Sequence, residues 1–178
     1  MTLKGPASRR QLLEQYPFAE YAATYWSKFA SKVESCSDEV VESVKRYYSA
    51  AAHEAFTIGY HISKPDHPHT NYGSETVAPL YYASFSGLLN SVKMLRIDTD
   101  INKKQGYYGC ALLAAVARKH LAIAKELLSR GANVNVEYRR TKPPLSTAVA
   151  NNDIAMIQLL IEHHADVNFT GGDDLGPL

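Results

Sequence analysis

The stretch CALLAAVARKHLAIAKELLSRGANVN, residues 110–135, decides the fold of this chain. Its apolar residues form two groups, a short one over 112–116 and a longer one over 121–128, near the i, i+3, i+4, i+7 spacing of a helix. Gly131 follows the second group, where glycine can adopt the left-handed backbone that ends a helix. Asn133 and Asn135 then favour a turn. The stretch therefore predicts two consecutive helices and a turn, with Leu127 buried.

The same pattern returns at a fixed interval. Asn102, Asn135 and Asn168 are equally spaced and close three similar phrases, DTDIN at 98–102, GANVN at 131–135 and HADVN at 164–168. Leucines keep nearly the same spacing, at Leu80, Leu112, Leu145 and Leu178. A period of about 33 residues with two helices per unit is typical of the ankyrin repeat. We therefore predict an all-α ankyrin-repeat solenoid of helix-turn-helix repeats at 75–102, 103–135 and 136–168, with the start of a fourth at 169–178.

The repeats differ at their ends. Pro144 can open the first helix of the third repeat, because the missing N–H would be unpaired there in any residue. His164 takes the place of the helix-ending glycine, so we expect a positive φ and a less stable corner at this position. The phrase GPL at 176–178 falls one full period after PPL at 143–145, which indicates a fourth repeat in a chain cut from a longer one; a coincidental tail is the alternative. An uncapped last repeat would also self-associate.

Residues 1–74 do not repeat, and we expect them to form an N-terminal helical cap and a connector. Apolar stripes at helical spacing run through 18–33 and 40–51, and a loop rich in proline and histidine follows at 61–73. Each stripe needs a surface to cover it. The two could pack on each other and on the first repeat, or could also dock on an upstream domain.

Several phrases resemble the start of the ankyrin array in fungal proteins that combine a NACHT-type signalling NTPase with ankyrin repeats. They are FAEYAATYWSKFA at 18–30, SKPDHPH at 63–69, LYYASFSGLLNSVKML at 80–95 and QGYYGCALLAA at 105–115. The resemblance implies protein binding through the hairpin tips and the exposed side of each first helix. The positions it points to are Glu75, Phe85, Ser86, Tyr107, Tyr108, Ala117, Arg118, Arg139, Arg140, Lys142 and Asn151. No phosphate-binding loop is present, so an NTPase domain would have to lie upstream.

The charge of the chain is near balance overall but uneven along its length. Of the 178 residues 46% are hydrophobic and 21% charged, and the formal net charge is +1. Residues 103–142 hold nine Lys and Arg against two acids, whereas 143–178 hold five acids and no Lys or Arg. Such asymmetry can orient a partner. Nucleic-acid binding through the basic stretch is a remote alternative, because no nucleic-acid motif accompanies it.

No group of residues makes a convincing catalytic, cofactor or metal site. The pair His53-Glu54 resembles a zinc-protease helix, but Thr57 stands where the second histidine belongs. The remaining candidates lack a base or further ligands; they are Cys36, Cys110, His61, His67, His69, His163 and His164. Low cysteine usage fits a reducing compartment, and no apolar run is long enough for a signal peptide or a membrane span. We therefore expect a cytoplasmic protein with no cofactor, no membrane contact and an unknown protein partner.

Three functions remain open at this point. The chain could be an adaptor that acts alone, a ligand-sensing fragment of a larger switch protein, or an enzyme or metal protein whose site lies in the N-terminal helices. Protein–protein recognition by a non-enzymatic module, within a larger signalling protein, is the reading that the repeats favour.

Overall fold

The computed structural model describes residues 14, 18–33, 37–47, 59, 78–95, 100–138 and 141–169. This part of the chain is all-helical, apart from two isolated β-bridges. The chain divides into two compact units, residues 1–76 and 77–178, which we describe separately. The helices in its described residues are α2 (Ala19–Val33), α3 (Asp38–Tyr47), α5 (Pro79–Ser86), α6 (Leu89–Met94), α7 (Ala111–Ala117), α8 (Leu121–Ser129), α9 (Pro144–Ala150) and α10 (Ile154–Glu162).

In the first unit, α2 packs against α3 through part of the expected apolar surface. Val41 and Val44 of α3 are buried, and the ring of Trp26 meets the ring of Tyr47 edge-on at 4.8 Å. Most of the stripe on α2 is exposed, so α3 does not cover it, and the alternative of docking on a further domain remains a prediction. The exposed residues of this stripe are Phe18, Tyr21, Tyr25, Phe29 and Val33. On α2 the buried residues include Ser27 and Ala30, which lie on a different side of the helix from this stripe.

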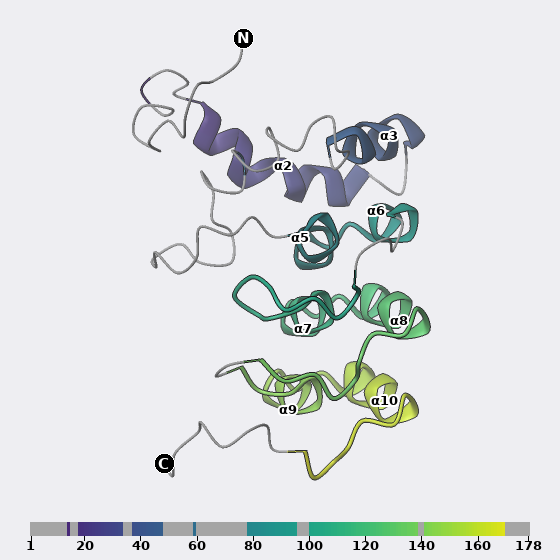
Figure 1. Ribbon diagram of the computed structural model, residues 1–178. Helices are drawn as coiled ribbons and strands as arrows, with labels where there is room; N and C mark the ends of the chain where they lie inside the picture. Colours follow the sequence, from purple (N-terminus) through teal and green to yellow (C-terminus); the bar gives the residue numbers. More distant parts are fainter. Residues whose placement is uncertain are drawn as a thin grey trace. The chain divides into compact units, whose positions relative to one another are not determined.

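The described residues of the second unit form a stack of three helix pairs. Each first helix packs on its own second helix, giving the pairs α5–α6, α7–α8 and α9–α10. Figure 1 shows α5, α7 and α9 in one column and α6, α8 and α10 in the other. Because each pair packs on its neighbour, the hydrophobic core of this unit runs between successive pairs.

Small residues allow these helices to approach closely. Ala114 and Ala115 of α7 have no exposed surface, and Leu112 and Leu113 beside them are almost fully buried. Leu127 of α8 is also completely buried, as the sequence predicts. Close packing of this kind makes the core sensitive to the loss of even one side chain.

The ends of the helices follow the predicted residues. Pro144 lies in the first turn of α9. Gly131 follows α8 with φ of 87°, and His164 follows α10 with φ of 63°. The expected positive φ at His164 is therefore confirmed. A left-handed backbone is unfavourable for a residue with a Cβ, so this corner carries a local cost.

The regular period of asparagines has a direct structural cause. The side-chain oxygen of Asn102 accepts a hydrogen bond from the backbone N–H of Asn133 at 2.8 Å. The side-chain oxygen of Asn135 accepts one from the N–H of Asp166 at 2.9 Å in the same way. Asn133 and Asp166 in turn accept the N–H two residues further on. Asn102 and Asn135 thus each join their own repeat to the next, and we call this series of bonds the asparagine ladder.

Several expectations fall outside the described residues. They concern Glu75, Arg139, Arg140, the connector at 61–73 and the phrase at 176–178. Among the helices that the structure describes, none is long and apolar enough to cross a membrane.

Candidate functional site: the hairpin surface

The loop before α7 forms a short hairpin that the first repeat holds in place. Gln105 and Gly109 form an antiparallel bridge, in which the N–H of Gln105 donates to the carbonyl of Gly109 at 2.7 Å. The buried side chain of Gln105 accepts a hydrogen bond from the N–H of Ala78 at 2.7 Å. The hydroxyl of Tyr81 accepts the N–H of Tyr108 at 3.2 Å. The hairpin is therefore tied to the start of α5 at two points.

Two glycines allow this hairpin to lie close to its neighbours. Gly106 has φ of 65° and Gly109 has φ of 91°, values that residues with a side chain rarely adopt. A Cβ on Gly106 would overlap the ring of Tyr81, and one on Gly109 would overlap the ring of Tyr138. Glycine is therefore required at both positions by backbone conformation and by space.

The hairpin presents an aromatic cluster backed by an arginine. Tyr107 is 46% exposed, and its ring meets that of Tyr108 edge-on at 5.0 Å. The ring of Tyr108 lies 6.1 Å from that of Phe85 on α5. The guanidinium of Arg118, at the end of α7, lies 4.9 Å from the centre of the Phe85 ring. These contacts restrict the side chains that a partner would meet, so less conformational entropy is lost when it binds.

His120 fixes the end of α5 beneath this cluster. Its Nε2 lies 3.2 Å from the backbone carbonyl of Phe85. Because a carbonyl only accepts, Nε2 must carry the proton in this contact. Burial lowers the pKa of His120, the contact with Phe85 raises it, and the charge of Arg118 lowers it further. The net shift is downward, so the imidazole is neutral at neutral pH.

Asn151 connects the second and third repeats at the same side of the stack. Its side-chain amide donates to the carbonyls of Val116 and Ala117 at 3.4 and 3.5 Å. In return, the ammonium of Lys119 donates to the carbonyl of Asn151 at 2.9 Å. The amide of Asn151 is thus already engaged within the chain, and the residue is only partly exposed.

A second hairpin carries the basic residues of the third repeat. Tyr138 and Thr141 form its bridge, and both the N–H and the hydroxyl of Thr141 donate to the carbonyl of Tyr138, at 2.9 and 2.6 Å. Lys142 follows it and is exposed. Arg139 and Arg140, which the sequence places at the tip, lie outside the described residues.

Among the predicted residues that the structure describes, Phe85, Tyr107, Tyr108 and Arg118 form one cluster, Asn151 donates to Ala117, and Lys142 follows the second hairpin. We call the group formed by Phe85, Tyr107, Tyr108, Ala117, Arg118, Lys142 and Asn151 the hairpin surface. Tyr107, Arg118 and Lys142 present exposed side chains, and Tyr108, Ala117 and Asn151 are half-buried. Phe85 is only 8% exposed, against the expected exposed face, because Arg118 and Tyr108 lie against its ring.

Two further residues lie at helix ends: Ser86 is the last residue of α5, and Lys119 follows α7. The hydroxyl oxygen of Ser86 is buried and has no hydrogen-bond partner among the described residues. Lys119 is exposed beside Arg118, with φ of 62°. Lys119 was not among the predicted partner-binding positions, although its position directly after Arg118 was a usable signal.

The cysteine in the described part of the chain has a structural role. Cys110 precedes α7, and its sulfur accepts a hydrogen bond from the N–H of Leu113 at 3.4 Å. Burial raises the pKa of its thiol more than hydrogen bonds from Leu113 and Leu112 lower it. A protonated thiol is a poor nucleophile. Among the described residues, no three His, Cys, Asp or Glu side chains gather where they could hold a metal ion.

Stacked helix pairs with protruding hairpins define a helical repeat protein. In this class the repeats together form one extended binding surface. A family model for ankyrin repeats in three copies matches residues 80–171, more than half of the chain. The chain therefore belongs to the ankyrin-repeat family, whose repeats generally serve as protein–protein interaction modules.

Comparison with known proteins gives relatives that are much longer than this chain. Ankyrin repeat and SOCS box protein 16 of Mus musculus is 32% identical over 111 residues, which are 57% of this chain and 24% of that protein. Transient receptor potential cation channel subfamily A member 1 of Homo sapiens is 30% identical over 96 residues, 52% of this chain and 9% of that protein. Ankyrin repeat protein nuc-2 of Neurospora crassa is 28% identical over 134 residues, 73% of this chain and 12% of that protein.

Proposed function

We propose that this chain is a non-enzymatic recognition module that binds a protein partner through the hairpin surface. The observation that carries the proposal is the Tyr107–Tyr108–Phe85–Arg118 cluster, in which exposed groups are held by buried ones. Tyrosine and arginine are the residue types most often found as energetic anchors of interfaces. We further propose from the sequence that Ser86, Arg139 and Arg140 contribute to binding; Glu75, the remaining position that the resemblance implies, stays a prediction outside the described residues.

The charges around this cluster favour an acidic partner. Lys103, Lys104, Arg118, Lys119 and Lys142 are all exposed in the part of the chain that the structure describes. Positive residues at the rim of an interface speed the approach of a negative partner and orient it. We therefore propose that the bound segment carries several carboxylates and an apolar or aromatic side chain that packs on Tyr107.

The test is a comparison of matched variants against a purified partner. A partner captured with the intact chain is purified, and its Kd is measured by calorimetry at two salt concentrations. Tyr107→Ala and Arg118→Glu should each weaken binding by about tenfold or more, equivalent to about 1.4 kcal/mol. The control is Lys125→Glu, which changes an exposed cation on α8, away from the hairpins.

The affinities of these variants distinguish binding at the hairpin surface from binding elsewhere. Weakening by both variants, with the control unchanged and affinity falling as salt rises, supports the proposal. Unchanged affinity in both Tyr107→Ala and Arg118→Glu would show that the partner binds elsewhere. Arg139→Glu combined with Arg140→Glu extends the same test to the second hairpin.

The broader role is also a proposal. The relatives are several times longer, and one is a fungal ankyrin-repeat protein. We propose that the module works in the cytoplasm within a signalling protein, with residues 1–74 as its helical cap. The alternative is the ligand-sensing part of a fungal NACHT-type NTPase. Tight binding of a single-stranded oligonucleotide, measured by fluorescence anisotropy, would instead favour the nucleic-acid alternative.

A further inference from the structure

Lys119 closes the first helix of its repeat in a backbone conformation that suits glycine better. The N–H of His120 donates to the carbonyl five residues earlier, as the N–H of Leu88 does one repeat before. The residue in the corresponding place of the first repeat is Gly87, with φ of 80°, whereas Lys119 has φ of 62°. A left-handed backbone is unfavourable for a residue with a Cβ. Strained residues gather at functional sites, so the lysine side chain is a candidate for a role in binding.

The side chain of Lys119 is held in place by the next repeat. Its ammonium donates to the backbone carbonyl of Asn151 at 2.9 Å, and Asn151 in turn donates to the carbonyls of Val116 and Ala117. An ammonium has three N–H donors, so two remain for a ligand. A lysine loses much conformational freedom when it binds, and here part of that loss has already occurred. The contact therefore leaves an exposed and restrained cation with unused donors.

Arg118, the preceding residue, is restrained by the repeat on the other side. Its guanidinium lies 4.9 Å from the centre of the Phe85 ring on α5. Among the described residues, neither Arg118 nor Lys119 has a carboxylate as an ion-pair partner. Burial is the main cause of the lowered pKa of His120, and the charge of Arg118 lowers that pKa further, which indicates an uncompensated positive field. Two adjacent cations are thus held by the repeats before and after them.

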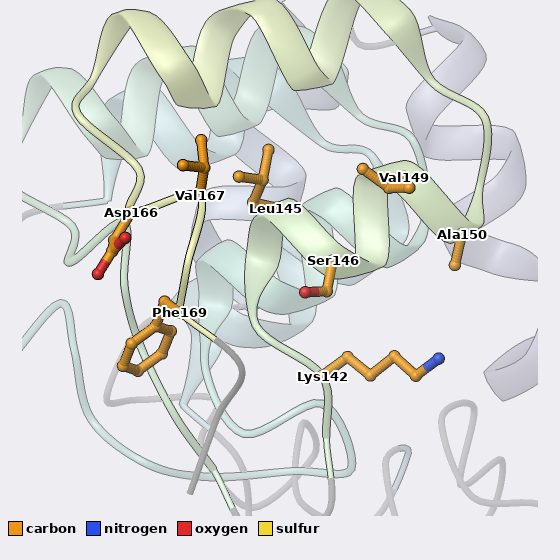
Figure 2. Close-up of a pocket in the computed structure, with 8 residues that line it drawn as sticks. All are labelled: Lys142, Leu145, Ser146, Val149, Ala150, Asp166, Val167 and Phe169. Carbon is orange, nitrogen blue, oxygen red and sulfur yellow. The ribbon is translucent and has the colours of Figure 1, made fainter.

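Lys142 differs from this pair because its ammonium is not held. Figure 2 shows its side chain extended at a hollow of about 400 Å³ that Ser146 and Asp166 also line. In the described part of the chain, the ammonium of Lys142 makes no hydrogen bond or ion pair. A flexible cation of this kind attracts an acidic partner but loses its freedom on binding, so it contributes less to affinity.

We propose that Arg118 and Lys119 bind two neighbouring carboxylates of the protein partner, and that Lys119 determines the specificity for the second one. This inference rests on the proposed function, because it names the chemistry that is recognised beside Tyr107. Arginine binds a carboxylate through two parallel N–H donors, and the ammonium of lysine binds one as a point charge. Arg118 packs on Phe85 of the first repeat and Lys119 on Asn151 of the third, so two carboxylates fit this arrangement better than one.

The test uses a random peptide library displayed on phage and selected against the intact chain. Selected peptides should carry two acidic residues close together, with an apolar or aromatic residue near them. One such peptide is synthesised with a fluorescent label, and its Kd is measured by anisotropy for the intact chain and for Lys119→Met. This substitution keeps the length of the side chain and removes its charge, so it should weaken binding by roughly fivefold or more.

A double-mutant cycle then assigns the contact to Lys119. Two further peptides, in each of which one acid is replaced by its amide, are measured against both chains. One of them should bind the intact chain roughly fivefold more weakly than the parent peptide, and should bind Lys119→Met as well as the parent does. Lys142→Met is the matched control, and it should weaken binding by less than about twofold.

Lys119→Gly separates a role in binding from a purely structural role. It removes the ammonium and relieves the left-handed backbone. Its urea midpoint should therefore not fall below that of the intact chain, while its affinity drops as in Lys119→Met. A fall in the midpoint without a loss of affinity would show that Lys119 only joins two repeats, and would overturn the proposal.

Other outcomes of the peptide measurements would overturn it as well. Equal losses in Lys119→Met and Lys142→Met would mean that only the total charge matters. Selected peptides that lack acidic residues, or whose Kd is unchanged in Lys119→Met, would show that Lys119 does not determine specificity. If these peptides still require Tyr107, this inference alone fails. If Tyr107→Ala also leaves their affinity unchanged, or if the selection yields no binder, the proposed function fails with it.

Discussion

Arg130 illustrates at the residue scale how neighbouring repeats are held together. Its guanidinium donates to the carbonyls of Val92, Lys93 and Leu95 at 3.0, 2.7 and 3.3 Å, at the end of α6. Its Nε donates to the carboxylate of Glu126 at 2.7 Å. The last carbonyls of a helix have no partner within it, and a cation there also suits the helix dipole. One side chain of the second repeat thus caps a helix of the first.

Replacing Arg130 by alanine should therefore destabilise the protein more than a substitution near the surface usually does. We expect Arg130→Ala to lower the free energy of unfolding by about 2 kcal/mol, since several hydrogen bonds from a charged donor are lost. Urea denaturation followed by circular dichroism measures the change. Lys125→Ala, at an exposed position of the same helix, should cost less than about 0.5 kcal/mol. Equal effects in the two variants would contradict the capping role.

The corner after α10 shows at the element scale how a helix end sets local stability. His164 has the positive φ that Gly131 has one repeat earlier. We expect His164→Gly to raise the free energy of unfolding by about 0.5–1 kcal/mol. The left-handed conformation costs a residue with a side chain roughly 1–2 kcal/mol, and glycine avoids this cost. Glycine also gives the unfolded chain more conformational entropy, which offsets part of the gain.

His163 provides the matched control for this prediction. It caps the same helix with φ of −93°, where a side chain is well tolerated. His163→Gly should therefore give no gain, and thermal melts of the two variants should move in different directions. A stabilisation of the same size in both would indicate that the backbone strain at His164 is negligible.

The helix pairs could be predicted from the sequence because their signals are local and periodic. The Leu and Ala pattern of α7 and α8, the glycine after α8 and the proline of α9 each act within one turn or one repeat. The burial of Phe85 could not be predicted, since it depends on Arg118, which comes from the next repeat. The apolar stripe of α2 was predicted from its spacing, but spacing alone does not show what covers such a face.

The candidate site likewise contains residues that the sequence could predict and contacts that it could not. Tyr107 was predicted because the resemblance points to the hairpin tips, and the structure places it exposed in the hairpin that Gln105 and Gly109 close. The hydrogen bonds of Asn151 to α7 and of Gln105 to Ala78 could not be predicted. Each joins residues that are far apart in the sequence, and no local pattern indicates such a contact.

At the scale of the whole molecule, stability comes from contacts between successive repeats. Leu127 lies fully buried on α8, which packs against α7, α6 and α10. We expect Leu127→Ala to lower the free energy of unfolding by roughly 2–5 kcal/mol, because it leaves a cavity in a closely packed core. Leu121→Ala, on an exposed part of the same helix, is the control. Urea denaturation measures both changes. If Leu127→Ala lowers the free energy of unfolding by less than about 0.5 kcal/mol, the effect is that of a surface substitution, and Leu127 does not pack between repeats.

The asparagine ladder has a mechanical consequence. Its links run in series along the stack, from Asn102 to Asn133 and from Asn135 to Asp166. A force that separates successive repeats of the second unit would therefore stretch these links along one edge of the stack, together with the packed helices beside them. Each link uses only the oxygen of the amide. Replacing either asparagine by aspartate would therefore keep an acceptor for the link while adding a negative charge beside it.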